Sequence, residues 1–149
     1  MPLPNIFTQE VAEGMIARIN ELTTQSQPQW GKMNCGQMLA HLTEALRMAL
    51  GDLQIKPKGG PLRYWPLKPL ILNWLPFPKG APTAPELIAR SPKEIGPEVA
   101  ELHKLLERFV ASTTRQDWPE HPAFGKLSAQ EWGALIYKHM DHHLRQFGV

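Results

Sequence analysis

Apolar residues recur every three to four positions in four separate stretches of the chain. This spacing places apolar side chains along one face of a helix. No stretch alternates between apolar and polar residues with the period of two that a half-buried strand shows. The sequence therefore predicts an all-α fold with four helices.

The first two predicted helices have clear boundaries. The first begins after Thr8 and ends in the polar run of residues 23–29, and the second opens with a capping-box pattern at residues 34–37 and stops at Gly51. Their apolar stripes are Val11, Met15, Ile19 and Leu22 in the first helix, and Met38, His41, Ala45 and Met48 in the second. His41 thus stands in the middle of an apolar helical face.

The two remaining helices also open with capping boxes. Residues 91–94 read Ser-Pro-Lys-Glu, which predicts Ser91 as the cap and Pro92 as the first helical residue. Residues 128–131 read Ser-Ala-Gln-Glu and start the last helix. The inward stripe of that last helix includes Trp132, His139 and His143, so two histidines occupy core positions.

The segment from Pro57 to Pro85 differs in composition from the rest of the chain. It holds eight of the fifteen prolines together with Tyr64, Trp65, Trp74 and Phe77. So many prolines predict that no regular helix forms there. The aromatic residues favour packing over disorder, and a connection this long is expected to cover a site, to form a partner surface or to carry function.

His139 and His143 lie one helical turn apart, so both imidazoles can approach the same metal ion. His41 supplies a third candidate ligand from another helix, because an imidazole on an apolar face needs a hydrogen-bond partner or a metal. Taken alone, His41 is more typical of a hydrogen-bonded core residue. The pair His139 and His143 makes a metal site more favourable than a hydrogen-bonded core histidine. The three histidines together predict a metal site with open coordination positions.

Several neighbouring residues have two interpretations each. Gln146 can orient a metal-bound water or cap a backbone group, and His142 is expected on a flank of the site or at the surface. Glu44 is interpreted as a solvated carboxylate. Cys35 begins a helix, where the dipole lowers a thiol pKa, yet a structural role is preferred. His121 is expected to border the pocket or to cap the last helix.

Charge, apolar stretches and cysteine content bear on the partners and the location of the protein. The net charge is +2, from 16 basic and 14 acidic residues, and no cluster of Lys and Arg resembles a nucleic-acid-binding stripe. The apolar stretch at residues 67–77 is too short and too interrupted by polar residues and prolines to span a membrane. A single cysteine and an N-terminus without signal-peptide character predict a cytoplasmic protein of one domain, residues 1–149.

With these motifs, the chain resembles the DinB/YfiT-like superfamily of metalloenzymes, and within it a bacterial subfamily. The resemblance covers nearly the whole chain and is carried by residues 29–33, 37–41 and 121–127 and by the tail at 139–148, in which His-x-x-x-His-x-x-Gln is the most specific part. It implies an antiparallel four-helix bundle in which His41, His139 and His143 bind a divalent metal. Zinc or nickel is expected, with iron and manganese as alternatives.

The resemblance also bears on function. Characterised members include thiol transferases and an isomerase that use low-molecular-weight thiols, which makes a metal-dependent thiol transferase or hydrolase acting on a small molecule the expected function. The alternative is a non-catalytic metal- or ligand-binding module that assembles as a homodimer through the Pro57–Pro85 segment. A shared fold does not decide between them.

Overall fold

The computed structural model describes residues 4–79 and 83–149, and in these ranges it contains helices and no strand. The prediction of an all-α fold is confirmed. The long helices are α1 (Gln9–Asn20), α2 (Cys35–Leu50), α4 (Ile95–Val110) and α5 (Ala129–Gln146). Three short elements, η1 (Pro61–Arg63), α3 (Leu67–Asn73) and η2 (Pro85–Leu87), lie in the connection between α2 and α4.

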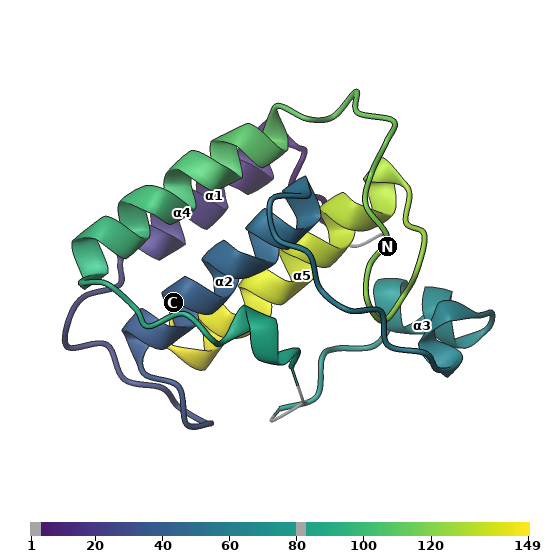
Figure 1. The fold of residues 1–149 in the computed structure, drawn as a ribbon. Coiled ribbons are helices and arrows are strands. Elements are labelled where there is room, and N and C mark those ends of the chain that lie inside the picture. The colour runs from purple at the N-terminus through teal and green to yellow at the C-terminus, as the bar shows by residue number, and fades with distance from the viewer. Residues whose placement is uncertain (1–3, 80–82) are drawn as a thin grey trace.

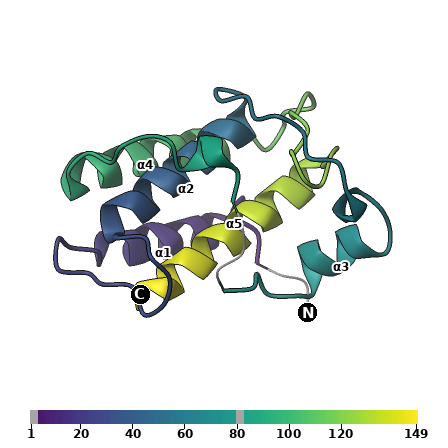
Figure 2. The same ribbon diagram turned by 60° about the horizontal axis from the view of Figure 1, so that its bottom comes forward.

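The long helices pack as two layers, with α1 beside α4 and α2 beside α5, and α2 also packs on α4 (Figures 1 and 2). The colours in Figure 1 show that α2 and α5 run in opposite directions, as do α1 and α4. Helices α2 and α4 run the same way, because the long connection of residues 51–94 returns the chain to the end where α2 began.

Three of the four predicted helix starts are confirmed. Helix α1 begins at Gln9 after Thr8, and α2 and α5 have complete capping boxes formed by Asn34 with Gln37 and by Ser128 with Glu131. In each box the cap side chain accepts from the backbone N–H three residues later, and the later side chain accepts from the cap's backbone N–H. Gly51 ends α2 in the left-handed conformation, with φ of 88°.

The predicted start of the third long helix is wrong. Helix α4 begins at Ile95, with Glu94 in the cap position and no side-chain cap, whereas the capping-box pattern predicted Ser91. Glu94 takes the extended cap conformation, and the carboxylate of Glu98 in the first turn of α4 accepts the backbone N–H of Lys93 at 2.9 Å, so a contact from within the helix replaces the predicted Ser91 box.

The prediction that the Pro57–Pro85 segment contains no regular helix is also wrong, because α3 occupies Leu67–Asn73. Pro66 precedes this helix and Pro69 lies in its first turn, where backbone N–H groups have no partner inside the helix. The Lys138 ammonium of α5 donates to the carbonyl of Ile71 and lies 4.8 Å from the centre of the Phe77 ring. These contacts hold the segment against α5.

The core lies between the two layers. Its largest fully buried side chains include Trp132, Phe109, Met38, Leu42 and Leu106. The N-terminal residues close one end of the core, where the Phe7 ring stacks on Phe109 with centroids 5.1 Å apart. Among the described helices, none has the length and apolar character needed to cross a bilayer.

Candidate metal centre

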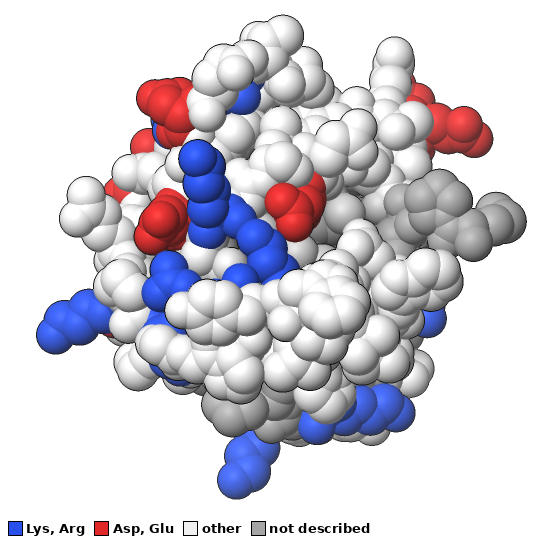
Figure 3. Space-filling model, turned by 90° about the vertical axis from the view of Figure 1, so that its right-hand side faces the viewer, with Lys and Arg blue, Asp and Glu red and all other residues white. Residues whose placement is uncertain are grey.

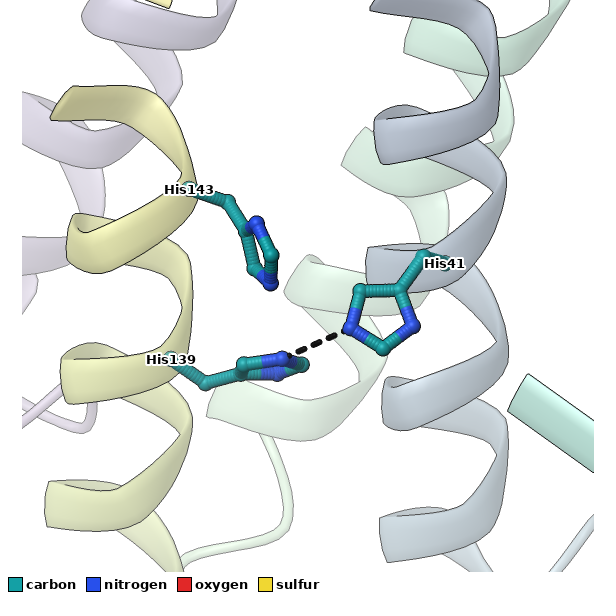
Figure 4. A group of neighbouring side chains, drawn as sticks. All are labelled: His41, His139 and His143. Carbon is teal, nitrogen blue, oxygen red and sulfur yellow. Dashed lines mark hydrogen bonds between the residues drawn. The ribbon is translucent and has the colours of Figure 1, made fainter. Parts of the chain in front are cut away.

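The three predicted histidines converge in the structure, His41 from α2 and His139 and His143 from α5 (Figure 4). One ring nitrogen of each lies within 4.8 Å of the others, and the ring centroids are 4.7, 4.8 and 4.9 Å apart. His41 and His143 are buried and His139 is half-buried. This group could hold a metal ion through three imidazole nitrogens.

A backbone carbonyl fixes the tautomer and the orientation of the His41 ring. The Nδ1 atom of His41 lies 3.3 Å from the carbonyl oxygen of Leu87 in η2. A carbonyl only accepts, so Nδ1 carries the proton and Nε2 keeps its lone pair. That Nε2 atom lies 2.9 Å from Nε2 of His139 and faces the common point of the three rings.

His143 is oriented by Gln146 in the same way. The amide nitrogen of Gln146 donates to the carbonyl of Trp30 at 2.9 Å, which places its Oε1 atom 2.8 Å from Nδ1 of His143. The ring nitrogen therefore donates and Nε2 of His143 is free to bind a metal. Of the two predicted roles of Gln146, the structure shows the bond to a backbone group, and it adds the bond to His143.

Burial keeps these imidazoles neutral. Desolvation lowers the pKa of His143 to about 4 and that of His139 well below its usual range, with the neighbouring histidines contributing. Burial also lowers the pKa of His41, and its bond to Leu87 offsets part of that effect. Metal ligation needs neutral imidazole, and the lowered pKa values favour this neutral form of all three rings near pH 7.

Replacing Gln146→Leu is expected to weaken metal affinity by roughly 10- to 100-fold, because His143 loses the acceptor that fixes its tautomer. Competition with a chromophoric chelator measures this change. Gln130→Leu is the matched control, because the exposed Gln130 also lies on α5 and its side chain makes no hydrogen bond among the described residues. Equal affinity of the two variants would contradict the role of Gln146.

The triad opens onto a cavity of about 550 Å³. Its walls are mainly apolar, and its charged residues among those described are Lys32 and Lys58, with no Asp or Glu. The apolar wall includes Met48, Leu62, Ile71, Phe77, Leu135 and Ile136. Residues of the Pro57–Pro85 segment therefore cover the histidines, as one interpretation of that segment predicted.

His142 and His121 both line this cavity. The half-buried ring of His142 meets Trp30 and Phe77 edge-on, with centroids 5.8 and 6.0 Å apart, and burial lowers its pKa. His121 accepts the backbone N–H groups of Ala123 and Phe124 through Nδ1, so its Nε2 carries the proton. The expectation that His121 borders the pocket is confirmed.

The metal-free protein is expected to lose stability as the pH falls, partly through His121. Burial lowers the pKa of His121 to about 4, against about 6.5 in an unfolded chain, so the unfolded chain binds the extra proton first. The stabilisation is present above pH 6.5 and is lost between about pH 6.5 and 4. Urea unfolding should show that about 1–2 kcal/mol of the loss between pH 7 and 5 depends on His121.

His121→Asn is the test variant for this pH effect, because Oδ1 of asparagine can accept the same two backbone N–H groups and does not titrate. We expect a shallower decline of stability with pH in the variant. A decline as steep as that of the wild-type protein would show that His121 makes no contribution.

The prediction that Glu44 is solvated is wrong, and the pKa direction expected for Cys35 is reversed, while the preferred structural role of Cys35 stays a prediction. Glu44 is buried, not solvated, because Arg47 and Arg90 donate to its carboxylate. Burial raises the pKa of the Cys35 thiol, contrary to the lowering expected from the helix dipole, and Cys35 is absent from the cavity wall.

Two contacts that fix the site could not be predicted from the sequence. His41 bonds the backbone carbonyl of Leu87, and Gln146 bonds that of Trp30. Any residue type supplies a backbone carbonyl, so neither bond leaves a pattern in the sequence.

The family model of the DinB superfamily matches residues 7–147. No curated protein and no solved structure matches the chain significantly. The family match extends from just before α1 to the end of α5 and includes all three histidines. The chain belongs to the DinB superfamily.

Proposed function

We propose that this protein is a divalent-metal-dependent enzyme that acts on a small, largely apolar molecule, with His41, His139 and His143 as the metal ligands. The observation that carries the proposal is the convergence of three neutral imidazoles on one side of a 550 Å³ cavity. Two of the rings are held with Nδ1 protonated, which leaves Nε2 with its lone pair. This donor set fits zinc or nickel and also accepts iron or manganese.

A divalent ion with open positions lowers the pKa of a bound thiol or water and supplies a nucleophile near neutral pH. The protein contributes the remaining conditions. Leu87 and Gln146 keep His41 and His143 in the Nδ1-protonated tautomer, and the mainly apolar wall lowers the local polarity around the site. No nucleophilic side chain of the chain itself is needed.

Transfer of a low-molecular-weight thiol fits the cavity better than hydrolysis. Water is a much weaker acid than a thiol, so hydrolysis benefits more from a carboxylate base. The described cavity wall holds no Asp or Glu, and the nearby carboxylate of Glu44 is engaged by two arginines. His142 on the described wall beside the triad is a neutral imidazole that a hydrolytic reaction could use as a base, whereas Nδ1 of His121 already accepts two backbone N–H groups.

The first experiment measures the metal content of tag-free protein and then offers the zinc- and nickel-loaded forms a thiol together with an apolar alkyl or aryl halide. Cysteine and glutathione serve as thiols, and an apolar ester is tested in parallel. Mass spectrometry should detect the thioether product only with metal present. A protein that binds no divalent ion after reconstitution would overturn the proposal, and ester cleavage without thioether formation would favour the hydrolase.

One observation favours an assembly role as a second function. Trp65 and Trp74 are 84% and 73% exposed, and Tyr64 is 68% exposed, which is unusual for large aromatic side chains. They lie in the segment that carries α3, and Figure 3 looks onto that end of the molecule, where uncharged side chains cover much of the surface. We propose that this face pairs with a second copy of the chain.

The variant Trp65→Ser with Trp74→Ser is expected to shift the protein from dimer to monomer while leaving its helical content unchanged. Both side chains are exposed, so their removal disturbs little of the core. Light scattering after size exclusion measures the mass, and circular dichroism measures the helix content. A wild-type protein that is monomeric at micromolar concentration would rule out this pairing.

A further inference from the structure

Four charged side chains form a network beside the candidate metal centre: Glu44 and Arg47 on α2, Arg90 before α4, and Glu98 on α4. The guanidinium of Arg90 donates through Nε to Glu44 at 3.1 Å and through its two terminal nitrogens to both oxygens of Glu98 at 2.6 and 2.9 Å. The side chains of Glu44 and Glu98 are only 5% and 1% exposed. Arg90 therefore joins two buried carboxylates from different helices.

The same network fixes residues 87–90, which supply the hydrogen-bond partner of His41. These residues are attached to α2 at two points one helical turn apart: the Leu87 carbonyl accepts from His41, and Arg90 donates to Glu44. Glu98 holds them from the other side, through Arg90 and through the backbone N–H of Lys93. The position of the Leu87 carbonyl thus depends on the bridge at Arg90.

We infer that Arg90 is a positioning residue of the metal centre. It holds the Leu87 carbonyl against Nδ1 of His41, and this keeps the Nε2 lone pair of His41 directed at His139 and His143. The inference rests on the proposed function, in which His41 is a metal ligand. Arg90 touches neither the metal nor the substrate and acts through Leu87.

The geometry of arginine is essential to this role. Its planar guanidinium presents several donors at fixed angles, so one group can satisfy Glu44 and both oxygens of Glu98 together. Lysine has the same charge on a single nitrogen and cannot maintain this three-bond bridge. Arg90→Lys therefore retains the charge of the network and removes the bridge.

The test compares Arg90→Lys and Glu44→Met with the wild-type protein. Glu44→Met removes the acceptor of the Arg90 Nε–H and leaves the pair of Arg90 with Glu98 intact, so it still tests the inference if Arg90→Lys does not fold. The matched control is Arg108→Lys. Two guanidinium nitrogens of Arg108 on α4 bond Asp52, and this pair forms no hydrogen bond with residues 87–90, which carry the partner of His41. Two quantities are measured: zinc affinity by chelator competition, and the histidine tautomers of the metal-free protein by ¹⁵N NMR.

Both test variants are expected to bind zinc at least about tenfold more weakly. In the metal-free variants His41 should show a mixture of tautomers, whereas Arg108→Lys should match the wild-type protein in both measurements. Wild-type affinity and a single His41 tautomer in both test variants would overturn the inference. If the wild-type protein binds no divalent ion, the proposed function fails, and the NMR measurement still decides whether Arg90 controls His41.

Discussion

The double variant His139→Ala with His143→Ala should fall from about one bound divalent ion per chain to almost none and should retain its helical fold. The two histidines supply two of the three converging nitrogens, and His41 alone binds a divalent cation weakly. The fold should survive because α5 keeps its capping box and the core contacts of Trp132 and Leu144. Elemental mass spectrometry and circular dichroism measure the two properties.

His103→Ala is the control for this experiment. His103 lies on α4, outside the histidine triad and outside the cavity wall, and its buried Nε2 atom has no hydrogen-bond partner among the described residues. The control should retain its metal. Equal metal loss in the control and in the double variant would show that the ion is bound elsewhere, and retained metal in the double variant would exclude the triad as the site.

The variant Arg90→Met should lower the free energy of unfolding by about 3–5 kcal/mol, the largest stability effect that we expect from a single substitution. It leaves Glu98 buried without its charged partner, and Glu44 retains only Arg47. The neighbouring Arg90 guanidinium lowers the pKa of Glu98. Because that pKa is depressed in the folded protein, the pair stabilises the fold above the unfolded pKa of Glu98, and this stability is lost as the pH falls through the folded value.

Denaturant unfolding at pH 7 measures this loss of stability. Arg108→Met is the matched control, because its partner Asp52 lies at the surface and an exposed pair contributes about 0–1 kcal/mol. Adding Glu98→Gln to Arg90→Met should restore part of the stability, since the buried charge is then removed. A loss for Arg90→Met no larger than that for Arg108→Met would contradict the importance of the buried network.

Local signals in the sequence predicted most of the helices. The capping boxes at Asn34 and Ser128 and the stop at Gly51 act within one helical turn, so they can be read without knowing the fold. The spacing of His139 and His143 on one turn is local in the same sense. The pattern at Ser91 failed because Glu94 takes the cap conformation and Glu98 accepts the Lys93 N–H, and Glu98 is positioned by Arg90, which also bonds Glu44 of α2.

The sequence by itself therefore determined the helical class, three helix starts and the three histidines that belong together. Only the tertiary structure decided how α2 and α5 approach each other, which carbonyls fix the imidazole tautomers, and that Glu44 is buried. These features come from segments far apart in the chain, such as Leu87 beside His41 and Trp30 beside Gln146. Hydrogen bonding within a helix is set by neighbouring residues, whereas the environment of a buried polar group is set by whatever the whole fold packs against it.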